Sequence, residues 1–540
     1  TENTTGASNT AVGAYALDAN TTASNCTALG HNALTANVDS TSNTAIGSNT
    51  LTVNNGGSYN TALGTGSLSG NTTASYNVAL GYEAMDQNTT GASNTAVGAF
   101  ALERNTTASN NTAVGYEALE ENTDGADNTS VGAYALDANT TGDNNVALGK
   151  SALSANTTGN RNTAVGTSTL YVNTADDNTG CGYNALVANT TGTRNTSVGS
   201  YSLYDNTTGS HNTAVGYYAL TNNTTASYNT AVGDRALDSN VSGTRNTAVG
   251  YKALEDTGNG NDNTAVGYQA LDDCASSNNT AVGSGALKLM TTGTRNTAVG
   301  MDALTTQTTA DGNTAVGYRA GKFITTGHSN TAMGDDAGVN ITTGYQNVAI
   351  GFDAGESIST GENNTCVGRT AGQDITTGGN NLCLGNHAGK SASPSGSITT
   401  GSNSIVLGDN SPTNAYIKID WTVTSDRRDK TDITPFNHGL SWINKLNPVT
   451  YRWDNRSFYE DGKPDGSKKQ LQLNVGLIAQ DEIEVEKEHG FGDTSENMIV
   501  SHITEDGNYG MQYSKLVPIL INAVKELSAE VEQLKSSINN

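Results

Sequence analysis

One pattern dominates this sequence: a glycine that follows Asn-Thr-Ala-Val and returns about every 17 residues. This marker glycine falls first at Gly13 and Gly30 and continues to Gly385, with Gly408 as an offset last member, which makes 24 units. The spacing shortens to 16 twice and lengthens to 23 once, so loops absorb the changes. A period of 17 is too short for two packed helices. It predicts one rung of a parallel β-solenoid, in which short strands are joined by turns rich in Asn, Gly, Ser and Thr.

The strand that precedes the marker glycine has two apolar faces. The residue before the glycine is Val, Leu, Ile, Met or Cys in every unit, and the residue before that is nearly always small. Neighbouring strand residues point to opposite faces, so neither face is polar. The Ala-Leu pair in "YYAL" at 217–220 repeats this pattern. We infer that one face fills the interior of the rung and the other faces sister chains.

The energetics of one rung also favour association. Burying one Val and one Leu contributes about 3–6 kcal/mol, whereas ordering the backbone costs about 1–2 kcal/mol for each residue. A single rung therefore cannot stand alone. We expect an obligate parallel homotrimer, with the Asn at the head of each unit stacked into ladders. At about 4.8 Å per rung, the array spans roughly 115 Å.

The array changes character near residue 317. Up to Leu304, the residue four positions after the marker glycine is usually Leu. That position then becomes glycine, and an isoleucine appears three residues further along, at Ile324, Ile341, Ile358 and Ile375. Two interpretations stay open: a second kind of rung with different shape or chain packing, or drift within one fold.

Composition and charge exclude several classes of function. The formal net charge is −25, which argues against nucleic acid and anionic membrane as partners. No run of about 18 apolar residues exists, so we expect no membrane insertion. The five cysteines and seven histidines form no ligand spacing, so we expect no metal and no cofactor. Cys366 and Cys383 share one repeat position and are interpreted as small buried apolar residues.

The last 120 or so residues differ from the array. All three tryptophans lie beyond 420 and all six prolines at 394 or later, which places a domain boundary near 410–424. The final stretch predicts a helix with a coiled-coil seam over about 514–540. Valine at heptad position a with leucine at position d favours a two-stranded coiled coil. Because of the rest of the chain, we nevertheless expect three strands. The seam consists of Val517, Leu520, Val524, Leu527, Val531, Leu534 and Ile538.

Two resemblances extend this interpretation. The repeats resemble head repeats of trimeric autotransporter adhesins and repeats of phage tail fibres, which implies a left-handed β-roll with three chains. Four C-terminal segments resemble the intramolecular chaperone domain of phage endosialidases and tail fibres. They are "SDRRDKTDI" at 425–433, "LNPVTYRW" at 446–453, "VGLIAQDEIE" at 475–484 and "YSKLVPILINAVKEL" at 513–527. The resemblance implies an array over 1–408, a linker over 409–424 and an α+β chaperone over 425–540 that trimerises and then cuts itself off.

The same resemblance implies a catalytic dyad of Ser425 and Lys430, which cleaves the bond between Thr424 and Ser425. A serine needs a nearby base to act as a nucleophile, and burial can make a lysine such a base. Trimer formation could complete the pocket. The family often has Leu where this chain has Asp429, a change that could alter the lysine pKa and the rate. Trp442 and Trp453 are expected in the core of the domain.

These observations favour a trimeric phage tail fibre that attaches to a host surface glycan or protein. Its partners would include other tail proteins, and it would be made in the host cytoplasm and carried on the virion. The alternatives are a trimeric adhesin on a bacterial cell surface and, less favoured, a tailspike that degrades polysaccharide. An ice-binding solenoid is a remote fourth. The tyrosines after the marker glycine either stack on sugars or are ordinary surface aromatics.

Overall fold

The computed structural model describes residues 3–256, 258–391, 393–411, 418, 422–456, 459–504 and 507–539. Trp421 and most of the predicted linker 409–424 lie outside the described residues. The chain forms two compact units, Thr1–Arg319 and Ala320–Asn540, and each is considered by itself.

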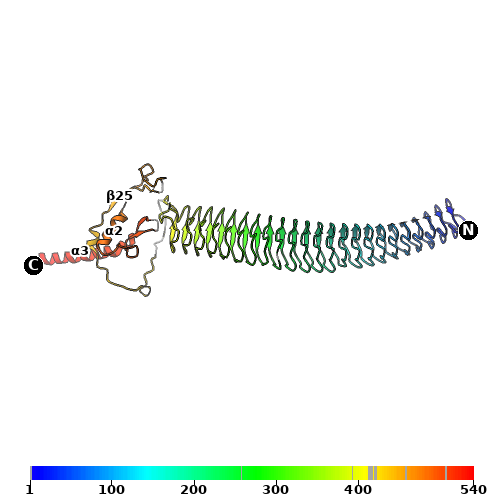
Figure 1. The fold of residues 1–540 in the computed structure, drawn as a ribbon, viewed down its shortest axis with the longest axis horizontal. Coiled ribbons are helices and arrows are strands. Elements are labelled where there is room, and N and C mark those ends of the chain that lie inside the picture. Colours follow the sequence, from blue (N-terminus) through cyan, green and yellow to red (C-terminus); the bar gives the residue numbers. More distant parts are fainter. Residues whose placement is uncertain are drawn as a thin grey trace. The chain divides into compact units, whose positions relative to one another are not determined.

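The first unit is a β-solenoid with one three-residue strand in each rung (Figure 1). Consecutive strands pair in parallel and in register, so that Thr10 lies opposite Thr27 and Ala11 opposite Ala28. The predicted parallel β-solenoid of 17-residue rungs is therefore confirmed. The strands are β1 (Thr10–Val12), β2 (Thr27–Leu29), β3 (Thr44–Ile46), β4 (Thr61–Leu63), β5 (Val78–Leu80), β6 (Thr95–Val97), β7 (Thr112–Val114), β8 (Thr129–Val131), β9 (Val146–Leu148), β10 (Thr163–Val165), β11 (Thr179–Cys181), β12 (Thr196–Val198), β13 (Thr213–Val215), β14 (Thr230–Val232), β15 (Thr247–Val249), β16 (Thr264–Val266), β17 (Thr280–Val282), β18 (Thr297–Val299) and β19 (Thr314–Val316).

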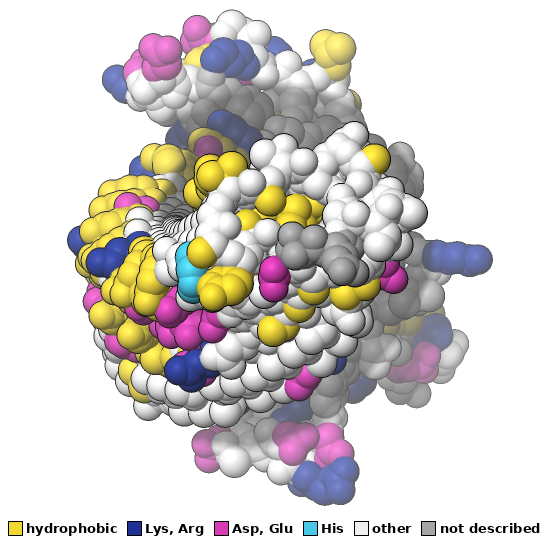
Figure 2. Space-filling model, turned by 90° about the vertical axis from the view of Figure 1, so that its right-hand side faces the viewer, with side chains coloured by type: hydrophobic (Ala, Val, Ile, Leu, Met, Phe, Trp, Pro, Cys, Tyr) yellow, Lys and Arg dark blue, Asp and Glu magenta, His cyan; other side chains and the backbone are white. Residues whose placement is uncertain are grey.

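In β2 to β19 the small middle residue of each strand faces the interior and the last residue, usually bulky, faces outward; in β1, at the end of the array, all three residues are exposed. Ala214, at the centre of β13, is fully buried, whereas Val215 keeps 36% of its surface exposed. Seen from the N-terminal end, hydrophobic side chains gather along one side of the array (Figure 2). The sequence argument assigned one strand face to sister chains, and within one chain the valine is partly exposed. Whether sister chains cover the valine column stays a prediction.

The Ala-Leu pair does not repeat the strand pattern, which corrects the sequence analysis. Ala118 and Leu119 are adjacent, yet both are fully buried. The reason is that Leu119 has a φ of 55°, in the left-handed region, which turns its side chain inward beside the alanine. A leucine in this conformation costs roughly 1–2 kcal/mol, and its burial offsets that cost with about 1.5–3 kcal/mol.

Two ladders of buried asparagines run through the first unit. In the ladder at the head of each unit, the Asn77 backbone N–H donates to Oδ1 of Asn60 at 3.0 Å, as predicted. The second ladder lies seven residues after the marker glycine and was not foreseen. There Nδ2 of Asn71 donates to Oδ1 of Asn54 at 2.7 Å and to the Ala74 carbonyl at 3.1 Å.

The second unit begins with the second kind of rung that the sequence suggested. The backbone of these rungs follows the same path, but different side chains fill the interior. Its strands are β20 (Thr331–Met333), β21 (Val348–Ile350), β22 (Thr365–Val367), β23 (Leu382–Leu384) and β24 (Ile405–Leu407). Gly338 replaces the inward leucine at a similar φ of 55°, and Ile341 replaces the ladder asparagine and is fully buried. A Cβ on Gly338 would lie 2.8 Å from Cδ1 of Ile341, so the isoleucine occupies the space that leucine fills elsewhere. Cys366 and Cys383 are buried in these rungs, as predicted.

The C-terminal part of this unit is a small α+β domain that ends in a long helix. Two antiparallel hairpins join β25 to β26 and β27 to β28. The elements are η1 (Arg427–Asp429), α1 (Leu440–Ile443), β25 (Val449–Tyr451), β26 (Asn474–Gly476), α2 (Ala479–Glu488), β27 (Ser501–Ile503), β28 (Tyr509–Met511), η3 (Tyr513–Lys515) and α3 (Leu516–Ile538).

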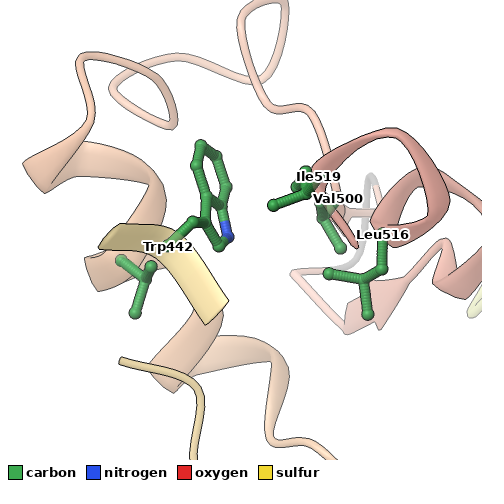
Figure 3. Packing of buried hydrophobic residues seen from close by; sticks show 5 residues of the cluster. Trp442, Val500, Leu516 and Ile519 are labelled. Atoms are coloured by element: carbon green, nitrogen blue, oxygen red, sulfur yellow. The ribbon is translucent and has the colours of Figure 1, made fainter. Parts of the chain in front are cut away.

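The core of this domain surrounds Trp442, which is fully buried, as predicted (Figure 3). Val500, Leu516 and Ile519 belong to the same cluster. Trp453 is not part of the core, which corrects the sequence analysis. It is 50% exposed, and its ring packs edge to face with the Tyr451 ring, at 5.3 Å between ring centroids.

Candidate active site

The segment before the first hairpin of the C-terminal domain carries the predicted dyad. Thr424 and Ser425 lie in irregular backbone, and η1 follows directly as a single short turn. The turn brings residue 430 back beside residue 425. Lys430 Nζ donates to Ser425 Oγ across 2.5 Å, so the structure places the two predicted catalytic side chains in direct contact.

Local hydrogen bonds close this turn. The Asp429 N–H donates to the Asp426 carbonyl and the Lys430 N–H to the Arg427 carbonyl, both at 3.3 Å. Oδ1 of Asp426 accepts the Arg428 backbone N–H at 2.8 Å, which makes Asp426 the N-cap. Asp is among the preferred residues at such a position because its side chain satisfies a backbone donor.

The charged side chains next to the dyad lie at the surface of the domain. The Arg428 guanidinium contacts the Asp426 carboxylate, with Nη2 and Oδ2 2.6 Å apart. This contact first, and then the Arg428 backbone N–H, hold the pKa of the Asp426 carboxyl below its ordinary value. Among the ion pairs of the described residues, none joins Asp429 to Lys430. Thr424, Ser425 and Lys430 are all exposed in the single chain.

The predicted seam lies on the helix α3, which begins at Leu516, two residues later than expected. All seven seam residues are exposed in the single chain: Val517, Leu520, Val524, Leu527, Val531, Leu534 and Ile538. The adjoining face begins with Leu516, Ile519 and Ala523, which are buried in the domain. The N-terminal half of α3 therefore packs on its own domain, and its apolar seam remains open along the whole helix.

Several contacts tie α3 to the rest of the domain. The Leu440 N–H donates to Oε2 of Glu526 at 2.6 Å, and Asn522 Nδ2 donates to the Phe436 carbonyl at 2.6 Å. A Cβ on Gly439 would lie 2.6 Å from the backbone nitrogen of Ala523, so α1 approaches α3 at a distance that only glycine allows. These contacts fix the helix that presents the seam.

Two buried glutamates of α2 were missed by the sequence analysis. Trp442 Nε1 donates to Oε1 of Glu482 at 2.8 Å, and burial raises the pKa of Glu482 to about 7. Glu486 accepts the backbone N–H groups of Val500 at 2.6 Å and Ser501 at 2.7 Å, which attaches β27 to α2. Both lie inside "VGLIAQDEIEVE", where alternation of acidic and apolar residues gave no sign of burial. The cap by Asp426 was also missed, although an Asp directly before a turn is a recognisable cap signal.

The described residues hold no group of three or more His, Cys, Asp or Glu side chains that could bind a metal ion. Within the same residues, no helix has the length and apolar character needed to cross a membrane.

One of three comparisons with known proteins gives a match. Searches of curated proteins and of solved structures found no match to the chain. The family described as chaperone of endosialidase matches residues 425–491, and this match begins at Ser425 itself. Residues 425–491 are thus similar to the chaperone of endosialidase family, and in the sequence they follow a β-solenoid array.

Proposed function

We propose that this protein is a trimeric fibre whose C-terminal domain trimerises, sets the register of the array and then cuts itself off between Thr424 and Ser425. The observation that carries the proposal is the contact of Lys430 with Ser425 at the first residue of the matched segment. The array forms the lasting part of the fibre, and residues 425–540 form the part that is removed.

Two exposed apolar surfaces support the trimer. One is the seam of α3, whose seven side chains would otherwise stay in water. The other is the column of outward residues at the end of each strand, such as Val215 and Val249. Large contiguous apolar patches on a chain of this kind are typical of association surfaces. In a parallel trimer, each surface would meet its counterparts on the other two chains.

The cleavage proceeds in two balanced steps. A neutral Lys430 amine accepts the Ser425 Oγ proton while Oγ attacks the Thr424 carbonyl carbon. The C–N bond breaks, the Ser425 nitrogen receives the proton, and Thr424 becomes linked to Oγ as an ester. Water then attacks the ester, which releases the Thr424 carboxylate and restores the serine hydroxyl. One water molecule is consumed.

Assembly provides the switch for this chemistry. In the single chain the dyad is exposed, and an ammonium donates hydrogen bonds but accepts none. Contact with a partner chain would bury the lysine, and burial disfavours its charged form. Cutting would therefore follow trimer formation, and removal of the domain would leave a fibre that unfolds slowly because its register can no longer be reset.

The cleavage is tested by intact mass on freshly expressed chains. The wild-type protein should give two products that end at Thr424 and begin at Ser425. Ser425→Ala and Lys430→Ala should each remain whole and still assemble. A wild-type trimer that stays intact for days contradicts the self-cleavage.

The trimer is tested separately in the uncut Ser425→Ala background. Leu520→Asp with Leu527→Asp places charges on the seam and should give monomers in sedimentation velocity. Ser528→Asp adds a charge to the same helix outside the seam and should leave the trimer intact. Monomers in the Ser425→Ala chain itself would contradict the proposal.

The fibre is proposed to serve host attachment on a phage tail, with other tail proteins at one end and a surface glycan or protein as its receptor. The acidic array favours a receptor that is not itself strongly anionic. Many surface tyrosines pack on each other; the rings of Tyr251 and Tyr268, for example, stack 5.4 Å apart. Immunogold labelling of purified virions should mark the tail, whereas labelling of uninfected cell surfaces would favour an adhesin.

A further inference from the structure

The dyad depends on one short turn that no core supports. The two side chains are five residues apart, so the chain must double back before Lys430 can reach Ser425. The turn η1 contains no buried residue, so packing does not hold it in place. Its geometry therefore rests on the hydrogen bonds within residues 425–430.

Among these hydrogen bonds, the one made by the Asp426 side chain is the shortest that closes the backbone of the turn. Oδ1 of Asp426 lies 2.8 Å from the Arg428 nitrogen, whereas the two backbone bonds of the turn measure 3.3 Å. Bonds at 3.3 Å are beyond the usual range for a strong N–H···O contact. The side chain thus provides the best-formed hydrogen bond of the backbone between the two members of the dyad.

We propose that Asp426 is a positioning residue for the self-cleavage, which caps the turn and so holds Lys430 against Ser425. This inference rests on the proposed function and assigns Asp426 no contact with the scissile bond. The carboxylate acts through the Arg428 backbone N–H, and its charge is not required for that role. An asparagine at 426 could accept the same hydrogen bond.

The contacts of Arg428 separate this role from an electrostatic one. Its guanidinium also binds Asp426, through Nε at 3.1 Å and Nη2 at 2.6 Å. That ion pair is on the surface, with 88% of the Arg428 side chain exposed, and such pairs contribute little. Arg428→Ala removes the ion pair and keeps the backbone donor. Arg428→Ala therefore serves as the control that loses the ion pair but keeps the cap, whereas Asp426→Ala loses both.

The experiment compares first-order cleavage rates of full-length trimers across a pH series. Asp426→Ala should slow cleavage by about tenfold at every pH, as expected when a capping side chain is lost. Asp426→Asn should restore the rate to within about threefold of wild type, because it keeps the acceptor. Arg428→Ala should cleave at the wild-type rate. The pH at half-maximal rate should be the same in all four proteins.

Two results would overturn the proposal while leaving the self-cleavage intact. One is a wild-type rate in Asp426→Ala. The other is an Asp426→Asn protein as slow as Asp426→Ala with a shifted pH profile, which would mean that charge matters and the cap does not. Sedimentation of each variant excludes a simple failure to assemble.

A second measurement does not depend on cutting. Hydrogen exchange at the Arg428 amide, in the Ser425→Ala background, should accelerate in Asp426→Ala and stay unchanged in Arg428→Ala. Equal exchange in the two variants would contradict the cap. If the wild-type chain never cleaves, the proposed function fails on the wild-type data alone, and Asp426 then has no reaction to serve.

Discussion

The array and the C-terminal domain bury their residues through two different kinds of contact. In the array, almost every contact joins a residue to its equivalent one rung away, as Asn77 joins Asn60. In the C-terminal domain, the decisive contacts join unlike residues far apart in sequence, such as Trp442 with Glu482 and Leu440 with Glu526. A repeated contact is satisfied equally well after a shift by one rung, whereas a unique contact is satisfied in one arrangement only.

This difference indicates why a repetitive array is followed by a conventional small domain. Nothing in a Thr-Ala-Val strand tells one rung from the next, so three such chains could pair out of step at little cost. The domain around Trp442 has a single packing, and α3 presents its seam in one orientation. Specificity that the array lacks is therefore available at its C-terminal end.

The largest expected effect separates the two tryptophans of the C-terminal domain. Trp442→Ala removes the centre of its core and the donor to Glu482, and should destabilise the domain by about 3–5 kcal/mol. Trp453→Ala should change stability by no more than about 0.5 kcal/mol, because Trp453 is half exposed. Hydrogen exchange should show lost protection in α2 and α3 only for Trp442→Ala, with β1 to β19 unaffected. Equal effects of the two variants would contradict the core assignment.

The next-largest effect tests whether the Leu and Asn inside a rung of the first kind can be replaced together by the Gly and Ile of the second kind. Leu102→Gly should cost at least about 3 kcal/mol through its cavity. Asn105→Ile should cost about 1–3 kcal/mol, because Asn105 donates to Asn88 and to the Ala108 carbonyl. The double variant recreates the Gly-Ile filling seen in Gly338 and Ile341. It should cost about 1–2 kcal/mol less than the sum, as measured by denaturant unfolding. Strict additivity would show that the isoleucine does not refill the space.

The array should also respond to pH more than its low charge density suggests. Burial first, and then the Glu255 carboxylate between them, raise the pKa of Asp238 and of Asp272 to about 6. A raised pKa means that the folded state binds the proton more tightly, so stability falls as pH rises from about 4 through about 6. The melting temperature should be higher at pH 5 than at pH 8. Replacing both aspartates by asparagine should weaken that dependence, and an unchanged dependence would contradict the assignment.

The smallest effect concerns the surface of the array. Arg245 Nε lies 2.6 Å from Oδ1 of Asp262 on the next rung, and both side chains are about half exposed. Exposed ion pairs contribute little, so Arg245→Ala should lower stability by less than about 1 kcal/mol. Its melting temperature should stay close to that of wild type. A loss comparable to that of Leu102→Gly would show that the surface, not the ladder interior, holds the rungs together.

The sequence predicted the array well and its interior less well. The period, the parallel register and the asparagine ladder at the head of each unit all followed from repetition, because identical rungs stack identically. The inward turn of Leu119 did not follow, since a left-handed leucine contradicts ordinary preference. A signal was present nonetheless: the same position becomes Gly321 and Gly338 later in the array, and glycine at that place is typical of a positive φ.

The candidate site shows the same division. Ser425 and Lys430 were named from a resemblance, and their spacing alone would have indicated nothing. The cap by Asp426 was readable in principle but has meaning only once the turn is seen. Trp442 and Trp453 could not be told apart by residue type, because only packing decides which of the two rings is enclosed.

By itself, the sequence determined that this chain repeats, how long each rung is, where repetition ends and which helix face is apolar. Those features depend on local period and composition, which a linear sequence records in full. Tertiary structure alone decided that Val215 faces outward while Leu119 faces inward, and that Lys430 contacts Ser425. It also decided that Glu482 is buried against Trp442 and Glu486 against β27. The physical reason is that side-chain direction depends on backbone dihedrals and on distant neighbours, and neither is specified by the identity of one residue.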